Sequence, residues 1–176
     1  VWNYHAGGQE FHQVKHFTDA ITGRFGEVTS AESLAQLSQL VTYEAQRSMF
    51  EAYARNRPKA TGVVQWMLNN AWPSMIWHLY DYYLRAGGGF FGTKKACEPL
   101  HVMYADDDQS AYLINDTRKG FKSLKVTARV FDTKLASLAT LEATVDVGPG
   151  EAKKVFALPD RATISGVYFV DLRLSD

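Results

Sequence analysis

The residues best suited to chemistry lie in one short run, Thr61 to Ser74, with the sequence TGVVQWMLNNAWPS. Two neighbouring amides, Asn69 and Asn70, stand between two indoles, Trp66 and Trp72. An indole offers a flat apolar face and an N–H donor, and a carboxamide offers one acceptor and two donors. This combination suits a ring that carries hydroxyl or amine groups, so we predict that these four residues bind such a ligand. The alternative is that the aromatic rings near this run are core packing, as we expect for Trp77, Tyr80, Tyr82 and Tyr83.

A buried strand and a helix are the elements expected to position these residues. The run from Val63 to Leu68 is apolar and partly β-branched, which predicts a strand that ends where polar residues begin. The run from Met75 to Leu84 repeats apolar residues at helical spacing, with Ser74 as its predicted N-cap. A strand, a polar loop and a helix form a βα unit, and functional residues in α/β barrels follow the carboxyl ends of the strands.

The first half of the chain has two further helical patterns. Apolar spacing predicts a short helix over Val14 to Thr22, stopped by Gly23 and Gly26. A long amphipathic helix is predicted to continue to about Arg55, and Thr29 with Glu32 matches a capping box at its start. The three glycines at 87–89 follow the predicted helix that ends near Leu84, where glycine commonly ends a helix.

The pattern changes to strict alternation after Pro99. Six segments of apolar and polar residues in turn, separated by Gly, Pro, Asn and Asp signals, predict an antiparallel sandwich of immunoglobulin type. We therefore divide the chain into an α/β part over residues 1–96 and an all-β part over residues 97–176. A single βα unit and a six-stranded sandwich both look incomplete, because a lone parallel strand leaves backbone groups unpaired and seven strands are usual. The chain is thus expected to be a piece of a larger polypeptide.

Composition and charge exclude several classes of partner. The net charge is +0, from 19 basic and 19 acidic residues, and no basic stripe could follow a phosphate backbone, so we predict no nucleic-acid partner. No apolar run approaches the roughly 20 residues of a membrane helix. The run VWNYHAGG at the start lacks the basic and apolar form of a signal peptide. Asn115, Asp116 and Thr117 match a glycosylation sequon, which matters only in a eukaryotic secretory context.

The metal and phosphate motifs of the chain are weak. His12 and His16 share a helix face, but Gln13 replaces the glutamate of a zinc protease motif and no third ligand is evident. The acidic run Asp106 to Asp108 lacks the ligand spacing of a calcium loop and fits a solvated turn. The glycines at 87–89 lack the preceding strand of a phosphate loop. We predict no metal and no cofactor.

A family resemblance covers almost the whole chain and is densest between Tyr43 and Tyr104. It rests on YEAQRSMFEAY, on WMLNNAWPS and on FGTKKACEPLH. These runs resemble the end of the catalytic barrel and the start of the next sandwich domain in glycoside hydrolase family 2. Within that family the chain is most similar to bacterial exo-β-D-glucosaminidases, followed by β-mannosidases and plant-type endo-β-mannosidases.

The resemblance implies a retaining glycosidase whose two catalytic carboxylates lie about 5 Å apart on earlier barrel strands, before Val1. No catalytic residue is then expected in this chain, and we interpret its glutamates at positions 10, 44, 51 and 98 as surface or packing charges. The implied substrate is a carbohydrate with a terminal β-linked sugar, foremost glucosamine in chito-oligosaccharides, and the implied partner is the rest of the parent polypeptide. The family also suggests a secreted or periplasmic protein. A β-mannosidase stays open as an alternative, as does a non-catalytic carbohydrate-binding or interaction module.

Overall fold

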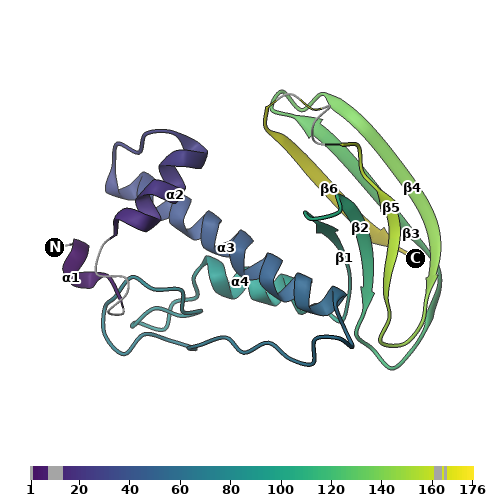
Figure 1. Cartoon of the computed structure of the whole chain (residues 1–176), viewed down its shortest axis with the longest axis horizontal. Helices are drawn as coiled ribbons and strands as arrows, with labels where there is room; N and C mark the ends of the chain where they lie inside the picture. The colour runs from purple at the N-terminus through teal and green to yellow at the C-terminus, as the bar shows by residue number, and fades with distance from the viewer. Residues whose placement is uncertain (1, 8–13, 161–163, 165) are drawn as a thin grey trace. The chain divides into compact units, whose positions relative to one another are not determined.

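The computed structural model describes residues 2–7, 14–160, 164 and 166–176. The chain forms two compact units (Figure 1). The first contains Val1–Phe50 and Gly62–Cys97, and the second contains Glu51–Thr61 and Glu98–Asp176. The long helix contributes to both units, because its last turn packs with the strands that follow Pro99.

The described helices are α1 (Trp2–His5), α2 (Lys15–Phe25), α3 (Ala31–Arg55) and α4 (Gly88–Ala96). Helices α2 and α3 confirm the two predicted from apolar spacing. Helix α2 passes through Gly23 and ends at Gly26, whose φ of 84° lies in the left-handed region that favours glycine. None of the described helices is long and apolar enough to cross a membrane.

Helix α3 begins with a different cap from the one predicted. The Oγ of Ser30 accepts a hydrogen bond from the backbone N–H of Ser33 at 3.1 Å. This bond satisfies one of the free N–H groups of the first turn. The predicted capping box of Thr29 and Glu32 is therefore wrong by one residue.

Helix α4 begins where glycines were predicted to end a helix, and it lies along α3 (Figure 1). A Cβ atom on Gly88 would lie 2.0 Å from the carbonyl oxygen of Gln39, and one on Gly92 would lie 2.1 Å from that of Tyr43. No side chain fits at such distances, so these glycines let the two helix backbones approach each other. The glycine run is a packing surface of α4, which corrects the earlier interpretation.

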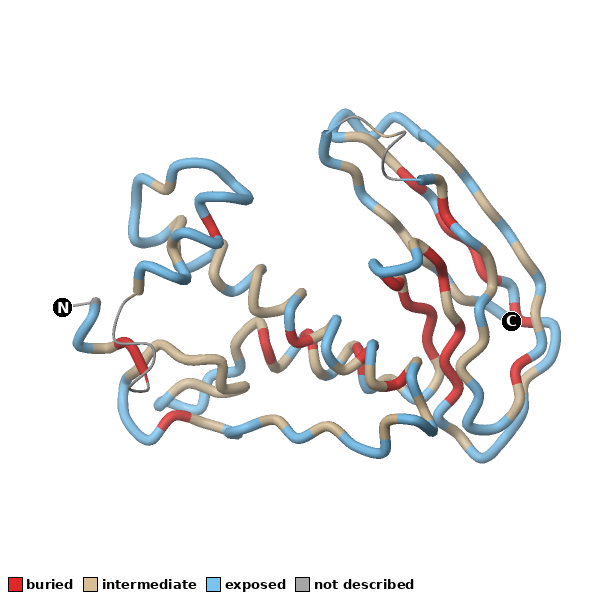
Figure 2. The backbone as a smooth tube through the Cα atoms, in the orientation of Figure 1, coloured by how far each residue is buried: buried red, intermediate tan, exposed pale blue. Residues whose placement is uncertain are grey.

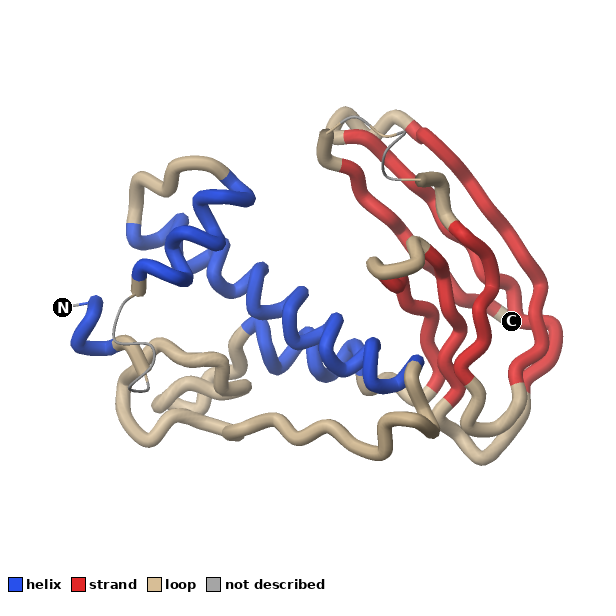
Figure 3. Tube along the Cα trace, in the orientation of Figure 1, coloured by secondary structure: helices blue, strands red, loops and turns tan. Residues whose placement is uncertain are grey.

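The predicted strand from Val63 to Leu68 is absent, and residues 56–87 contain no named helix or strand (Figure 3). Only isolated bridges form there, one of them the parallel pair Asn69 and Tyr80. The N–H of Tyr80 donates to the carbonyl oxygen of Leu68 at 3.0 Å. A strand needs a continuous neighbour for its backbone groups, and the described chain places none beside this run.

The predicted helix from Met75 to Leu84 is also absent. Its backbone groups bond to distant segments instead of the previous turn. The N–H of Met75 donates to His5 O at 2.7 Å, and its carbonyl oxygen accepts from Gly7 N–H at 3.0 Å. The carbonyl oxygen of Leu79 accepts from Gly87 N–H at 3.0 Å. These long-range bonds override the helical pattern of the sequence.

The second unit contains the six predicted strands, all antiparallel, in two three-stranded sheets. The strands are β1 (Leu100–Ala105), β2 (Ser110–Asn115), β3 (Phe121–Asp132), β4 (Ser137–Val147), β5 (Ala152–Ala157) and β6 (Tyr168–Ser175). The strand orders are β1-β2-β5 and β4-β3-β6.

The core of this unit lies between the two sheets. Val102 and Ala111 of the first sheet form one buried cluster with Val126 and Val130 of the second. Figure 2 shows buried residues along these strands. Burial on one face explains the strict alternation of β4, whereas residues of β1 and β2 are buried on both faces of their sheet.

The last turn of α3 covers the outer face of the first sheet, where Ala54 packs against Met103 and Ile114. Ion pairs lie at the edges of this contact. Arg55 pairs with Asp107 and Arg57 pairs with Asp116. Inside the contact, Glu51 and His101 are both buried, with Oε1 and Nε2 3.9 Å apart.

Asn115, at the end of β2, organises the turn that follows. Its side chain is completely buried. Its Nδ2 donates to the carbonyl oxygens of Lys119 and Gly148, both at 2.7 Å, and its Oδ1 accepts from the backbone and the hydroxyl of Thr117. Every hydrogen that this amide can donate is therefore used inside the protein.

Candidate functional site

Trp66 presents its indole to solvent while its backbone is fixed. The side chain is 71% exposed in the described chain. Its carbonyl oxygen accepts a hydrogen bond from Nε1 of Trp77, and the peptide bond to Met67 is cis. The carbonyl oxygen of Trp77 in turn accepts from Gln65 Nε2 at 3.2 Å. The loop therefore holds the backbone of Trp66 and leaves its ring free to contact a ligand.

Asn70 is buried and bonds to its own loop. Its Nδ2 donates to the carbonyl oxygen of Ser74 at 2.6 Å, and its Oδ1 lies 2.5 Å from Nδ1 of His78. Because Oδ1 can only accept, Nδ1 of His78 carries the hydrogen. Burial lowers the pKa of His78 below its ordinary value of 6.5, which favours the neutral ring. Asn70 thus orders residues 70–78.

Asn69 is only partly buried. Its Nδ2 donates to the carbonyl oxygen of Asn70 at 3.2 Å, and its backbone forms the bridge to Tyr80. One described contact leaves further donor and acceptor capacity on this amide. Of the two asparagines, Asn69 is therefore the better placed to contact a ligand.

Trp72 belongs to an aromatic group with Tyr4 and His5. Its ring is stacked on His5, with centroids 5.6 Å apart and planes at 26°, and meets Tyr4 edge to face at 5.6 Å. Nδ1 of His5 lies 2.5 Å from the carbonyl oxygen of Pro73, to which it donates. This group joins the start of the chain to the loop after Asn70.

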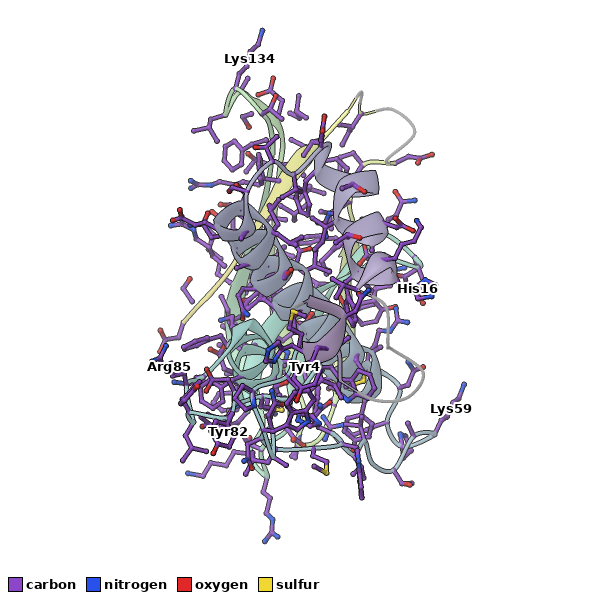
Figure 4. All side chains as sticks on the ribbon, turned by 90° about the vertical axis from the view of Figure 1, so that its left-hand side faces the viewer. Tyr4, His16, Lys59, Tyr82, Arg85 and Lys134 are labelled. Atoms are coloured by element: carbon purple, nitrogen blue, oxygen red, sulfur yellow. The ribbon has the colours of Figure 1, made fainter. Side chains whose placement is uncertain are left out.

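A pocket of about 320 Å³ opens beside this aromatic group. It is lined by His5, residues 73–75 and residues 81–83. Figure 4 labels Tyr82, one of these lining residues. Trp66, Asn69, Asn70 and Trp72 do not line it, although Trp72 stacks on His5. The prediction that these four residues bind a ligand is separate from this pocket.

Tyr82 and Tyr83 are the residues that sequence reasoning assigned to packing. They are 46% and 63% exposed in the described chain, and both line the pocket. The helical pattern of Met75 to Leu84 concealed them, because it placed Tyr83 on an inward face. A usable signal was the DYYLR run itself, in which two adjacent aromatics lie between charged residues.

Several acidic side chains of the described chain make contacts within the protein. Glu44 pairs with Arg24, and Glu51 lies beside His101. Asp107 pairs with Arg55, and residues 106–108 form the exposed turn between β1 and β2 that was predicted for them. Within the described residues no three His, Cys, Asp or Glu side chains gather as a metal site would require. Glu10 and His12, considered above, lie outside the described residues.

The proteins that this chain is similar to are glycosidases. No family model matches. The structure is similar, with a TM-score of 0.92 and 31% identity over 100% of this chain, to 22% of the crystal structure of an exo-chitosanase from Amycolatopsis orientalis. It also shares the fold of part of a β-D-mannosidase from Dictyoglomus thermophilum, with a TM-score of 0.82 and 19% identity over 98% of this chain and 21% of that one.

The particular relatives are exo-β-D-glucosaminidases. One from Streptomyces avermitilis is 36% identical over 94% of this chain and 19% of its own length. One from Arthroderma benhamiae is 35% identical over 100% of this chain and 20% of its own length. These findings confirm the resemblance seen in the sequence: the chain is homologous to one segment of the exo-β-D-glucosaminidases. It spans about a fifth of the length of these relatives.

Proposed function

We propose that this chain is a segment of an exo-acting, retaining glycoside hydrolase that removes terminal β-linked glucosamine from chito-oligosaccharides. The observation that carries the proposal is the similarity over the whole chain to exo-β-D-glucosaminidases, in sequence and in structure. The catalytic carboxylates would come from the rest of the polypeptide. We further propose that the first unit is the last part of a catalytic (β/α)₈ barrel, that the second is an immunoglobulin-like domain, and that the complete protein is secreted or periplasmic.

Within this enzyme, the proposed task of the first unit is to supply contacts to the sugar. Trp66 supports this assignment because its exposed ring sits on a fixed backbone, as a stacking platform requires. Asn69 and Trp72 are proposed as neighbouring contacts. Asn70 is proposed to act through the loop that it orders, with its remaining lone pair available to the sugar.

A β-mannosidase of the same family is the second candidate, favoured by the shared fold with the Dictyoglomus thermophilum protein. Glucosamine and mannose differ in the group at C2 and its orientation. Hydrolysis of p-nitrophenyl β-D-glucosaminide and β-D-mannoside by the complete polypeptide separates the two. We expect at least a tenfold higher kcat/KM for the glucosaminide, and a preference for the mannoside would favour the second candidate.

A non-catalytic carbohydrate-binding module is the alternative from another class. It predicts that the complete polypeptide binds glucosamine oligomers but hydrolyses neither substrate. Trp66→Ala in the complete polypeptide provides a second discriminating measurement. We expect it to lower kcat/KM at least tenfold while the melting temperature stays within about 2 °C, and unchanged kinetics would remove Trp66 from the site.

A further inference from the structure

We propose that the pocket formed by His5, Pro73, Met75, Asp81, Tyr82 and Tyr83 binds the sugar that follows the cleaved bond, and that Asp81 recognises the ammonium group of this sugar. The proposal rests on the proposed function, because it assigns a second glucosamine unit to the same substrate. It concerns side chains outside the four residues discussed above.

The size and walls of the pocket fit one sugar ring. Its volume of about 320 Å³ lies at the lower end of the range for small-molecule sites, roughly 300–1,000 Å³. Pro73, Met75 and the two tyrosines supply apolar surface, which suits the C–H face of a pyranose.

The two tyrosines form a corner. Their ring centroids are 5.2 Å apart and their planes meet at 80°. The guanidinium of Arg85 lies 5.5 Å from the centroid of the Tyr83 ring, a cation–π contact that holds this ring in place. A ring fixed before the ligand arrives loses less conformational entropy on binding.

Asp81 supplies the charge of the pocket. Its Oδ1 accepts the backbone N–H of Arg85 at 2.8 Å, and its own N–H donates to Arg85 O at 3.0 Å. Among the residues that the structure describes, Asp81 forms no ion pair, so its carboxylate charge is not neutralised there. The ammonium of glucosamine is a complementary ligand for this carboxylate.

The turn that presents these side chains is strained. Leu84 has a φ of 60° and is 68% exposed, although it is a large apolar residue. The left-handed conformation costs a non-glycine residue roughly 1–2 kcal/mol. Strain of this kind persists where surrounding contacts enforce it, and it is concentrated at functional sites. The bonds of Asp81 to Arg85 and Leu84 enforce it here.

The test compares substrates that differ only beyond the cleaved bond, using the complete enzyme. Tyr83→Ala is expected to lower kcat/KM for chitotriose at least fivefold and to change that for methyl β-D-glucosaminide less than twofold. The methyl group is too small to stack on a tyrosine. Tyr83→Phe should restore at least half of the lost kcat/KM, because it keeps the ring. Phe91→Ala removes an exposed ring of the same unit that does not line the pocket, and it should change neither substrate.

Asp81→Asn separates charge from folding, because the amide oxygen can still accept the Arg85 N–H. It should lower kcat/KM for the glucosamine disaccharide at least threefold, but not for the disaccharide with N-acetylglucosamine at its reducing end. For Tyr83→Ala, an equal loss of kcat/KM on chitotriose and on the methyl glycoside, or no loss on either, would overturn the pocket assignment. An equal Asp81→Asn effect on both disaccharides would overturn the recognition of the ammonium.

If the complete protein hydrolyses no glucosaminide, the proposed function fails. The pocket assignment is then tested by measuring the binding of chitotriose. A chitotriose dissociation constant that rises at least fivefold in Tyr83→Ala, measured calorimetrically, supports the pocket. An unchanged constant overturns it.

Discussion

Asn70 and His78 close the loop of residues 70–78 through one hydrogen bond, with Oδ1 and Nδ1 2.5 Å apart. The Nδ2 of the same amide donates to the carbonyl oxygen of Ser74. One buried side chain thus fixes both ends of the turn that follows Trp66. Asn70, which its residue type suggested as a ligand contact, thus makes hydrogen bonds within its own loop.

The first prediction concerns the stability of this loop. Asn70→Ala leaves the Ser74 carbonyl oxygen and the His78 N–H without their partner; a fully buried group left unpaired costs about 1–3 kcal/mol, and these two are partly buried. We expect the free energy of unfolding of the 176-residue chain, measured with urea, to fall by at least about 1 kcal/mol. Trp66→Ala is the control, because its exposed ring should change this value by less than about 0.5 kcal/mol. Equal losses in both variants would contradict the role of Asn70.

The second prediction concerns pH. The pKa of His78 is lowered by burial, so the unfolded chain binds more protons than the folded chain between the two pKa values. Stability from the neutral ring is fully present above the ordinary pKa of 6.5 and is lost as the pH falls below it. Hydrogen exchange of the amides in residues 70–80 should therefore accelerate, relative to the chain's other protected amides, between pH 7.5 and pH 5.5. In His78→Asn, which keeps a donor near Nδ1, this excess should disappear; an unchanged pH dependence would exclude His78 as its source.

The third prediction tests the contact between α3 and α4. Gly92→Ala places a Cβ 2.1 Å from the backbone oxygen of Tyr43, and a backbone atom cannot rotate away. Overpacking of this kind costs about 1–3 kcal/mol, so we expect the melting temperature to fall by several degrees. Gly23→Ala is the matched control: this helical glycine has open space around its would-be Cβ, and alanine there should raise stability by about 0.4–1 kcal/mol. A melting temperature unchanged by Gly92→Ala would show that the helices separate more easily than this packing implies.

The fourth prediction tests the ion pair of Arg55 and Asp107. The guanidinium lowers the pKa of Asp107 from 3.8 to about 2, chiefly through the hydrogen bond between the two side chains. Because the folded-state pKa is depressed, the stability that the pair supplies is present above pH 3.8 and is lost as the pH falls toward 2. Asp107→Asn should cost less than about 1 kcal/mol at pH 7, because the carboxylate is largely exposed.

The pH profile provides the control for this pair. The free energy of unfolding of Asp107→Asn should approach that of the parent chain at pH 2.5, and a constant difference from pH 7 to pH 2.5 would contradict the assignment. Asp19→Asn breaks the exposed pair with Lys15 on α2 and should cost no more than about 0.5 kcal/mol at pH 7.

The sequence predicted the elements that bury a face within this chain. Strands such as β3 alternate because one side packs on the opposite sheet, and α3 carries an apolar stripe for the same reason. Prediction failed where the backbone partner is not a neighbour in sequence. The Val63 run is apolar without a paired strand, and Met75 bonds to His5, about 70 residues earlier. The helical spacing of residues 75–84 carries no information about such bonds.

The sequence also could not predict how the side chains of the candidate site are bonded, because those bonds leave no local pattern. Residue type indicated that Trp66 and the asparagines could bind a ring, but it could not show that Asn70 uses its amide on Ser74 and His78. The pocket at Tyr82 and Tyr83 depends on the turn at Leu84, whose positive φ no pattern of leucine predicts. Local composition indicated candidate side chains, and the hydrogen bonds of the folded chain determine how each of them is presented.

The buried amide of Asn115 has a practical consequence for producing this protein. Its sequon is readable by an oligosaccharyltransferase only while the chain is unfolded, since both amide hydrogens later bond to Lys119 and Gly148. A glycan attached during synthesis would occupy the space of those bonds and block the β2 turn. Secretion from yeast should therefore yield either unmodified folded protein or a modified fraction retained by quality control. Thr117→Val removes the sequon but also the hydroxyl that bonds to Asn115, so a bacterial host is the better source of material.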